Sequence, residues 1–198
     1  MKYRNTVRIH EVITGAIDFI VSDSYLYNLF KKLLLDGELY SHSLNVAKLS
    51  IQLAISLGYD DDYLESIALG GLFHDIGKTQ ISADILYKAG KLTDEEFQIV
   101  KKHPTLGYNL LEGSCLSEDI RLMVLNHHEK KTGEGYPRGL TVLREQDEII
   151  TTADIFSALS EHRVYHQSRD ILETLEYIST FKDLNNNMLS RLPELVSD

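Results

Sequence analysis

His74-Asp75-Ile76-Gly77-Lys78 stands at the end of an apolar run in this chain of 198 residues. The run has helical spacing and predicts one buried helix face, made of Leu64, Ile67, Ala68 and Leu72. His74 lies seven residues after Ile67, two helical turns on, so its side chain is expected to point inward. A buried imidazole beside a carboxylate is costly unless something binds both, and a divalent metal ion suits this pair. Lys78, one turn further, could face an anionic substrate.

The composition favours one all-α domain. The length suits a single sizeable core, and the three prolines and few turn clusters favour helices. A net charge of -10 argues against a nucleic-acid polymer as partner, because such binding needs a basic face. There is no apolar signal core and no run long enough to span a membrane, so no membrane partner is expected. Cys115 is the only cysteine, which excludes an intrachain disulfide and favours the cytoplasm.

A second pair of candidates begins a helix after the first 37 residues. Residues 1–37 are expected to form a helical segment packed on the core, with Asp23 capping its second helix. Glu38 and His42 are four residues apart and therefore share one side of the next helix, which is predicted to stop near Gly58. Taken alone, this pair is more typical of a surface helix start than of a metal site.

A third candidate lies at a predicted helix junction. Thr93 and Glu96 form a capping-box pattern for a helix running to Lys102. Pro104 disfavours helical geometry at the residue before it, so His103 is expected between two helices. A junction can present an imidazole into a cavity, although a single His-Pro pair is weak evidence.

The second half of the chain adds two histidines and a carboxylate. His127 continues the apolar stripe of a predicted helix, and His128 follows it directly. Asp154 lies on the apolar stripe of a helix predicted over 145–160, where an unpaired carboxylate would be costly. Two closing helices are predicted, over residues 170–181 and 184–196.

Eight side chains are thus candidates for one metal centre: Glu38, His42, His74, Asp75, His103, His127, His128 and Asp154. Each alone has a structural explanation, but no single structural explanation covers all of them. Nitrogen and carboxylate ligands without cysteine suit iron, manganese or another first-row ion. Because the candidates are too many for one ion, the sequence predicts at least two divalent ions.

With these residues collected, the chain resembles the HD-GYP domain, a bacterial subgroup of the HD phosphohydrolase superfamily. The resemblance covers about residues 38–168 and includes the helix around His42, HDIGK at 74–78, LTDEEF at 92–97, KKHPTLG at 101–107, NHHE at 126–129, GEGYP at 133–137 and TTADIFSALSEHRVY at 151–165. It implies an HD-domain helical bundle with HD-GYP extension helices, spanning residues 38–198 as a single globular unit with the N-terminal segment. It also implies hydrolysis of cyclic di-GMP to linear pGpG, with GMP after a second cut.

The resemblance assigns roles to individual residues. It implies that the histidines and aspartates collected above are the metal ligands, and that Glu38 matches a glutamate which holds a third metal in some members. Asp75 and Lys78 match catalytic positions, with the lysine near the scissile phosphate. Tyr136 and Arg163 match residues that contact the nucleotide.

Three departures from the family pattern concern the substrate rather than the metals. Members commonly carry HHERxDGxGYP, where this chain has Lys130 and Thr132, and many have a base where this chain has His166. Lys130 keeps the charge but lacks the guanidinium fork. Lys130 and His166 are still expected at the substrate. Thr132 and His166 favour an alternative function, a receptor or interaction module that keeps its metals without turnover, whereas the full ligand set and Lys78 oppose it. A third reading, oxygenation at a di-iron centre or hydrolysis of another nucleotide, is disfavoured by the GYP loop.

A second copy of the chain or a regulatory protein is the expected protein partner.

Overall fold

The computed structural model describes residues 2–161 and 170–196, and every regular element within these ranges is helical. The predicted all-α class is therefore confirmed. The elements are α1 (Lys2–Ser22), α2 (Ser24–Leu35), α3 (Gly37–Leu57), α4 (Asp61–Phe73), the 3-10 helix η1 (Ile76–Gln80), α5 (Ala83–Leu86), α6 (Asp94–Val100), α7 (His103–Leu111), α8 (Glu118–Asn126), α9 (Glu145–Ser160), α10 (Ile171–Ile178), α11 (Asn186–Leu189) and α12 (Leu192–Val196). Among these helices, none is both long and apolar enough to cross a lipid bilayer.

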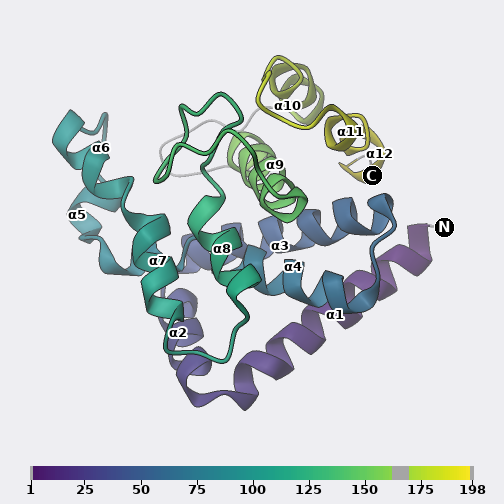
Figure 1. Cartoon of the computed structure of the whole chain (residues 1–198), viewed down its shortest axis with the longest axis horizontal. Helices are drawn as coiled ribbons and strands as arrows, with labels where there is room; N and C mark the ends of the chain where they lie inside the picture. Colours follow the sequence, from purple (N-terminus) through teal and green to yellow (C-terminus); the bar gives the residue numbers. More distant parts are fainter. Residues whose placement is uncertain (1, 162–169, 197–198) are drawn as a thin grey trace.

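Helices α3 and α4 form the centre of the molecule (Figure 1). They pack against each other, α1 lies against both, and α9 packs along α3. Helices α7 and α8 pack together, with η1 against α7 and the end of α4 against α8. The short helices α10 to α12 gather beside α9 and complete the bundle (Figure 1).

Two glycines allow α4 to approach both α3 and α8 closely. A Cβ atom added to Gly71 would lie only 2.7 Å from the Cα atom of Ala47 in α3. A Cβ atom added to Gly70 would lie 2.9 Å from the sulfur of Met123 in α8. The glycine pair therefore brings the helix of His74 against both the helix of His42 and the helix that ends before His127.

Local capping signals place most helix boundaries where the sequence predicts them. The Asp23 carboxylate accepts hydrogen bonds from the first turn of α2, and Gly58 ends α3 with a φ of 91°. The Thr93–Glu96 capping box is present at α6, although this helix ends at Val100 rather than at Lys102. Helix α9 has the predicted bounds.

The C-terminal prediction is wrong in part. The predicted helix over residues 184–196 is two short helices, α11 and α12. Asn185 caps α11 through a hydrogen bond from the Asn187 N–H, and Pro193 lacks the N–H that one continuous helix would need. The helix predicted over residues 170–181 is the shorter α10.

Helices α1 and α2 contribute to the same hydrophobic core as the helices that follow them. Ile13, Ala16 and Ile20 of α1 and Leu26 of α2 belong to the same hydrophobic cluster as the buried residues of α3 and α4. Helices α1 and α2 thus pack on this core, and the division of the chain into residues 1–37 and 38–198 stays a prediction.

Candidate metal centre

The structure brings six of the predicted ligands together in the interior, and their side chains come from five helices or helix ends. Each residue is at most 7% exposed: His42 in α3, His74 and Asp75 after α4, His103 at the start of α7, His127 after α8, and Asp154 in α9. His128 is half-buried beside His127, with 4.2 Å between their ring centroids.

Three of the histidines are oriented in the same way. The Nδ1 atoms of His74, His103 and His127 each lie 2.7 Å from the backbone carbonyl oxygen three residues earlier. A carbonyl oxygen only accepts hydrogen bonds, so Nδ1 must carry the proton in each ring. In the neutral ring, the Nε2 lone pair is then left facing the interior, which is the arrangement of a metal-binding histidine.

The inward-facing nitrogen and oxygen atoms do not supply one another with suitable hydrogen-bond partners. The Nε2 atoms of His103 and His127 are only 3.1 Å apart, so two lone pairs oppose each other when both rings are neutral. His74 Nε2 and Asp75 Oδ1 are buried without a hydrogen-bond partner among the described residues. Burying such atoms costs free energy, and a cation between them would offset this cost. The donor set therefore fits divalent metal ions.

The described ligand atoms form three compact groups, each within 4.8 Å: His42–His74–Asp75, His74–His127–Asp154 and His103–His127–His128. His74 and His127 each belong to two groups, so neighbouring groups share a ligand. This geometry suits a row of adjacent ions better than one isolated ion.

Asp75 lies at the middle of the cluster. Its carboxylate is 3.2 Å from His103 Nε2, 3.3 Å from His74 Nε2 and 2.5 Å from Lys78 Nζ. Burial alone raises the pKa of this carboxyl, but nearby positive charge, the Lys78 ammonium first, outweighs burial and holds the pKa well below its usual range. Asp75 is thus an ionised carboxylate that can face two neighbouring cations.

His127 and His128 are held in the neutral form that binds metal. Burial, together with the neighbouring histidines, lowers the pKa of His127 well below its usual range. Burial likewise lowers the pKa of His128 to about 3.

His42 is bound differently, and its partner is a residue that the sequence did not single out. His42 Nε2 is 3.0 Å from an Asp154 oxygen, and its Nδ1 is 3.0 Å from a Glu161 oxygen. Asn45 donates a hydrogen bond of 2.9 Å to the other Glu161 oxygen. Burial lowers the pKa of His42, but the hydrogen bonds with the two carboxylates outweigh burial and raise it to about 9. Glu161 follows α9 directly, so it is not part of an apolar stripe that would have predicted a buried position.

Glu38 is not part of these groups. It is half-buried in the first turn of α3, one turn before His42, and none of the three groups of described ligand atoms includes it. Its role as a further ligand stays a prediction.

The glycine-rich loop after α8 is anchored by Glu129, a second residue without a predicted role. The buried Glu129 carboxylate accepts hydrogen bonds from the N–H groups of Arg138, at 2.5 Å, and Leu140, at 2.8 Å. A Cβ atom added to Gly135 would lie 2.4 Å from the Lys130 nitrogen, so only glycine fits where the loop folds back. The Glu129 carboxylate therefore holds the loop beside the ligand cluster through the loop's own N–H groups.

Tyr136 of this loop lies at the edge of the cluster. Its ring centroid is 4.8 Å from that of His128, and the Lys101 ammonium lies 4.8 Å from the Tyr136 ring centroid. Lys130 is exposed on the same loop, and Thr132 is exposed with its hydroxyl 3.5 Å from the Glu134 N–H. The predicted substrate residues Arg163 and His166 lie outside the described residues.

A buried network fixes the helix end that presents His127. Asn126 donates a hydrogen bond of 3.1 Å to Asp147 at the start of α9. Two Arg144 nitrogens donate hydrogen bonds of 2.9 and 2.6 Å to the same carboxylate. Thr151 adds a contact of 2.9 Å from its hydroxyl to the His127 carbonyl oxygen. These residues position the ligand without touching the cluster interior.

Two characterised relatives are similar in sequence. The cyclic di-GMP phosphodiesterase of Thermotoga maritima is 33% identical over 178 residues, which is 86% of this chain and 47% of that protein. The cyclic di-GMP phosphodiesterase response regulator RpfG of Xanthomonas campestris is 36% identical over 129 residues, 63% of this chain and 34% of that protein. The chain thus spans between a third and a half of the length of these relatives.

Structure and family comparison agree on the fold. The Bdellovibrio bacteriovorus protein Bd1817, described as an HDG"Y"P protein, superimposes with a TM-score of 0.69 at 19% identity, over 98% of this chain and 63% of that chain. A family model described as "HD domain" matches residues 28–185. This range contains the helices and helix ends that carry the buried histidines and aspartates, and the chain belongs to the HD domain family.

Proposed function

We propose that this chain is a metal-dependent phosphodiesterase that hydrolyses cyclic di-GMP to pGpG and, after a second cut, to GMP. The proposal rests chiefly on the row of buried, inward-facing nitrogen and carboxylate ligands that share His74 and His127. The similarity to cyclic di-GMP phosphodiesterases supports it, and so does the GYP loop held beside the cluster.

The proposed ligands are His42, His74, Asp75, His103, His127, His128 and Asp154, with Glu38 for a third ion. The mixture of imidazole and carboxylate ligands without cysteine favours iron or manganese. Divalent ions bound there would lower the pKa of a water molecule and neutralise phosphodiester oxygens.

Lys78 is the proposed proton donor to the departing ribose oxygen. Its ammonium lies 2.5 Å from Asp75 and its side chain is 18% exposed, so it sits between the buried cluster and the solvent side. Asp75 orients this ammonium, and the positive charge can stabilise the oxyanion that develops as the ester bond breaks.

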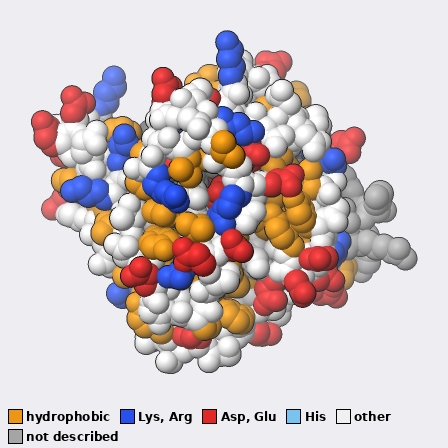
Figure 2. Space-filling view, in the orientation of Figure 1, with side chains coloured by type: hydrophobic (Ala, Val, Ile, Leu, Met, Phe, Trp, Pro, Cys, Tyr) orange, Lys and Arg blue, Asp and Glu red, His pale blue; other side chains and the backbone are white. Residues whose placement is uncertain are grey.

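The loop and nearby cations are proposed to hold the nucleotide. Tyr136 presents its ring beside His128, and Lys130 is exposed on the same loop. Several Lys and Arg side chains lie near the middle of the face shown in Figure 2, between scattered acidic groups. The net charge of -10 therefore does not exclude an anionic ligand, because the positive and negative groups are spread unevenly over the surface.

A receptor that binds the nucleotide without cleaving it is the second candidate. Thr132 favours it, because an exposed hydroxyl stands where the family pattern has a carboxylate. Restoring Asp at this position tests whether the substitution limits turnover.

The experiment is metal analysis together with a turnover assay on protein prepared without oxygen. The expected result is at least two transition-metal ions per chain and conversion of cyclic di-GMP to pGpG that stops when a chelator removes the metal. Asp75→Ala serves as the metal-deficient reference. Binding of the nucleotide to metal-loaded protein without any cleavage, before and after Thr132→Asp, would establish the receptor instead.

A further inference from the structure

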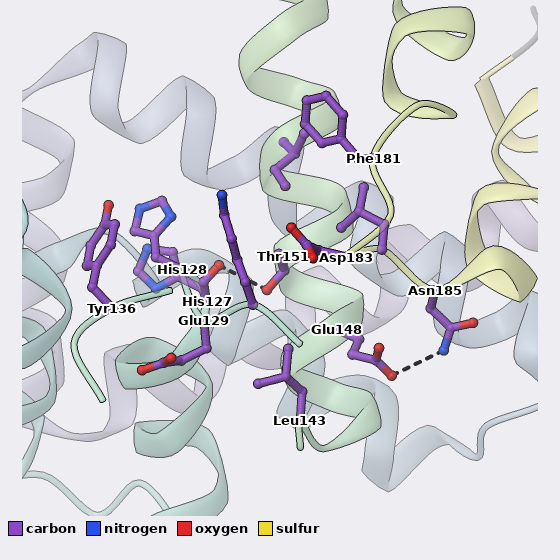
Figure 3. Close-up of a pocket in the computed structure, with 13 residues that line it drawn as sticks. His127, His128, Glu129, Tyr136, Leu143, Glu148, Thr151, Phe181, Asp183 and Asn185 are labelled. Atoms are coloured by element: carbon purple, nitrogen blue, oxygen red, sulfur yellow. Dashed lines mark hydrogen bonds between the residues drawn. The ribbon is translucent and has the colours of Figure 1, made fainter. Parts of the chain in front are cut away.

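A cavity of about 270 Å³ opens directly beside the metal cluster (Figure 3). Tyr136, His127 and His128 lie on one side of it, and Phe181, Asp183 and Asn185 lie on the other. The cavity is smaller than the roughly 300–1,000 Å³ typical of sites that enclose a drug-sized ligand. It therefore suits one base of a dinucleotide better than the whole molecule.

One buried carboxylate on the cavity wall has an oxygen whose partner is an exposed lysine. Glu148 in α9 is 9% exposed, and its Oε2 accepts a hydrogen bond of 3.1 Å from Asn185. Its Oε1 is buried and has no hydrogen bond from the described residues. The Lys131 ammonium lies against Oε1 as an ion pair, but the Lys131 side chain is 41% exposed and does not meet hydrogen-bond geometry. A ligand donor can take the place of Lys131 at this oxygen, because the lysine side chain is exposed to solvent.

A second carboxylate lines the same cavity. Asp183 lies in the loop between α10 and α11 and is half-buried. Within residues 2–161 and 170–196, no hydrogen bond or ion pair is formed by its side chain. An ionised carboxylate only accepts hydrogen bonds, so two such groups call for a ligand that presents donors.

The remaining wall is apolar and suits a flat ring. Leu143, Ile155, Phe181 and Leu184 line the cavity. Aromatic and apolar side chains stabilise nucleobases by contact with the ring face.

We infer that this cavity is the subsite for one guanine base of the substrate, with Asp183 and Glu148 accepting hydrogen bonds from its N1–H and N2–H groups. Guanine presents these donors side by side, whereas adenine presents a lone pair at N1, which a carboxylate repels. The inference rests on the proposed function and adds to it the residues that select the base.

Asp183→Asn and Glu148→Gln test the subsite in the metal-loaded protein. Each variant is expected to raise KM for cyclic di-GMP on the order of tenfold, the effect of losing one charge-assisted hydrogen bond. The kcat/KM ratio of cyclic di-GMP to bis(p-nitrophenyl) phosphate, which has no base, should fall by a similar factor. Asp18→Asn is the matched control, since Asp18 is exposed on α1 and the substitution makes the same charge change.

Calorimetric titration with GMP and with AMP gives a readout that needs no turnover. The two ligands differ only in the base, and the wild type should bind GMP more tightly, with the preference reduced in both variants. If the wild type cleaves bis(p-nitrophenyl) phosphate but no cyclic dinucleotide, the proposed function fails, and the GMP preference still decides the subsite. Cyclic di-GMP turnover with wild-type KM and an unchanged GMP preference in both folded variants would overturn the subsite alone.

Discussion

Replacing Gly77 by alanine tests how the HDIGK segment is packed against the helix that carries His103. A Cβ atom added at Gly77 would lie 2.0 Å from the His103 carbonyl oxygen and 2.6 Å from the Gly107 nitrogen. Both neighbours are backbone atoms of α7, so no side-chain rotation relieves the contact. Ordinary van der Waals contact begins at 3.4 Å, so η1 and α7 must move apart by roughly 1.4 Å.

The cost of this movement can be estimated. Overpacking of a well-packed interior costs about 1–3 kcal/mol, and a rigid backbone neighbour places Gly77→Ala at the upper end. For a chain of this length, about 3 kcal/mol lowers Tm by roughly 6–12 °C. In the wild type, His103 Nε2 is 3.2 Å from Asp75. Moving α7 away from η1 would displace His103 by much more than the ~0.2 Å tolerance of metal–ligand distances. The variant should therefore also lose metal.

Urea unfolding followed by circular dichroism, with metal analysis of the folded protein, measures both effects. Gly15→Ala is the control, because a Cβ atom at this position in α1 meets nothing within 4 Å. That substitution should stabilise the protein by about 0.5–1 kcal/mol through helix propensity. A Gly77→Ala protein with wild-type stability and full metal content would refute this account of the packing.

Four further predictions concern single side chains. Asp75→Ala should lose metal and with it the metal-dependent stabilisation, about 2.7 kcal/mol at a metal concentration 100 times Kd, measured by thermal unfolding with and without metal; full metal content in this variant would contradict its central position. Lys78→Ala should lower kcat by about 10²–10⁴-fold while metal analysis shows an unchanged content, and a loss of metal would instead make it a structural residue. Glu129→Gln should weaken two charge-assisted hydrogen bonds and destabilise the glycine-rich loop, seen as faster hydrogen exchange at Arg138 and Leu140; wild-type exchange rates would exclude the anchor. Glu38→Ala should remove one ion per chain and spare the others, and a wild-type crystal structure with two ions and Glu38 in solvent would exclude the third site.

Local patterns sufficed for most of the fold. Apolar stripes at helical spacing and capping residues placed α3, α4 and α9, because both signals depend on residues a few positions apart. The C-terminal helices were harder to predict, because Pro193 and the asparagine cap of α11 interrupt a segment whose apolar residues continue.

The partners of the cluster could not be predicted in the same way. Glu161 contacts His42, from which it is 119 residues away in the sequence. A single polar residue after a helix belongs to no sequence pattern from which such a contact could be predicted. Glu129 is the last residue of the NHHE motif at 126–129. Its partners are backbone N–H groups, which nearly every residue has, so the sequence does not identify them. Asp183 is likewise an isolated loop residue whose position beside the cavity depends on how α10 and α11 pack against α9.

The inward-facing histidines could be predicted because of where they stand on their helices. The last carbonyl groups of an α-helix lack a partner within the helix. His74 and His127 follow α4 and α8 directly, and each donates its Nδ1–H to such a carbonyl, that of Gly71 or Val124. His103 does the same with the last carbonyl of α6. One hydrogen bond thus satisfies the helix end and leaves Nε2 facing inward, so a histidine that continues an apolar stripe past its helix is already oriented as a ligand. His42 and Asp154 lie inside helices, where the backbone carbonyls are used, and they are oriented by each other and by Glu161.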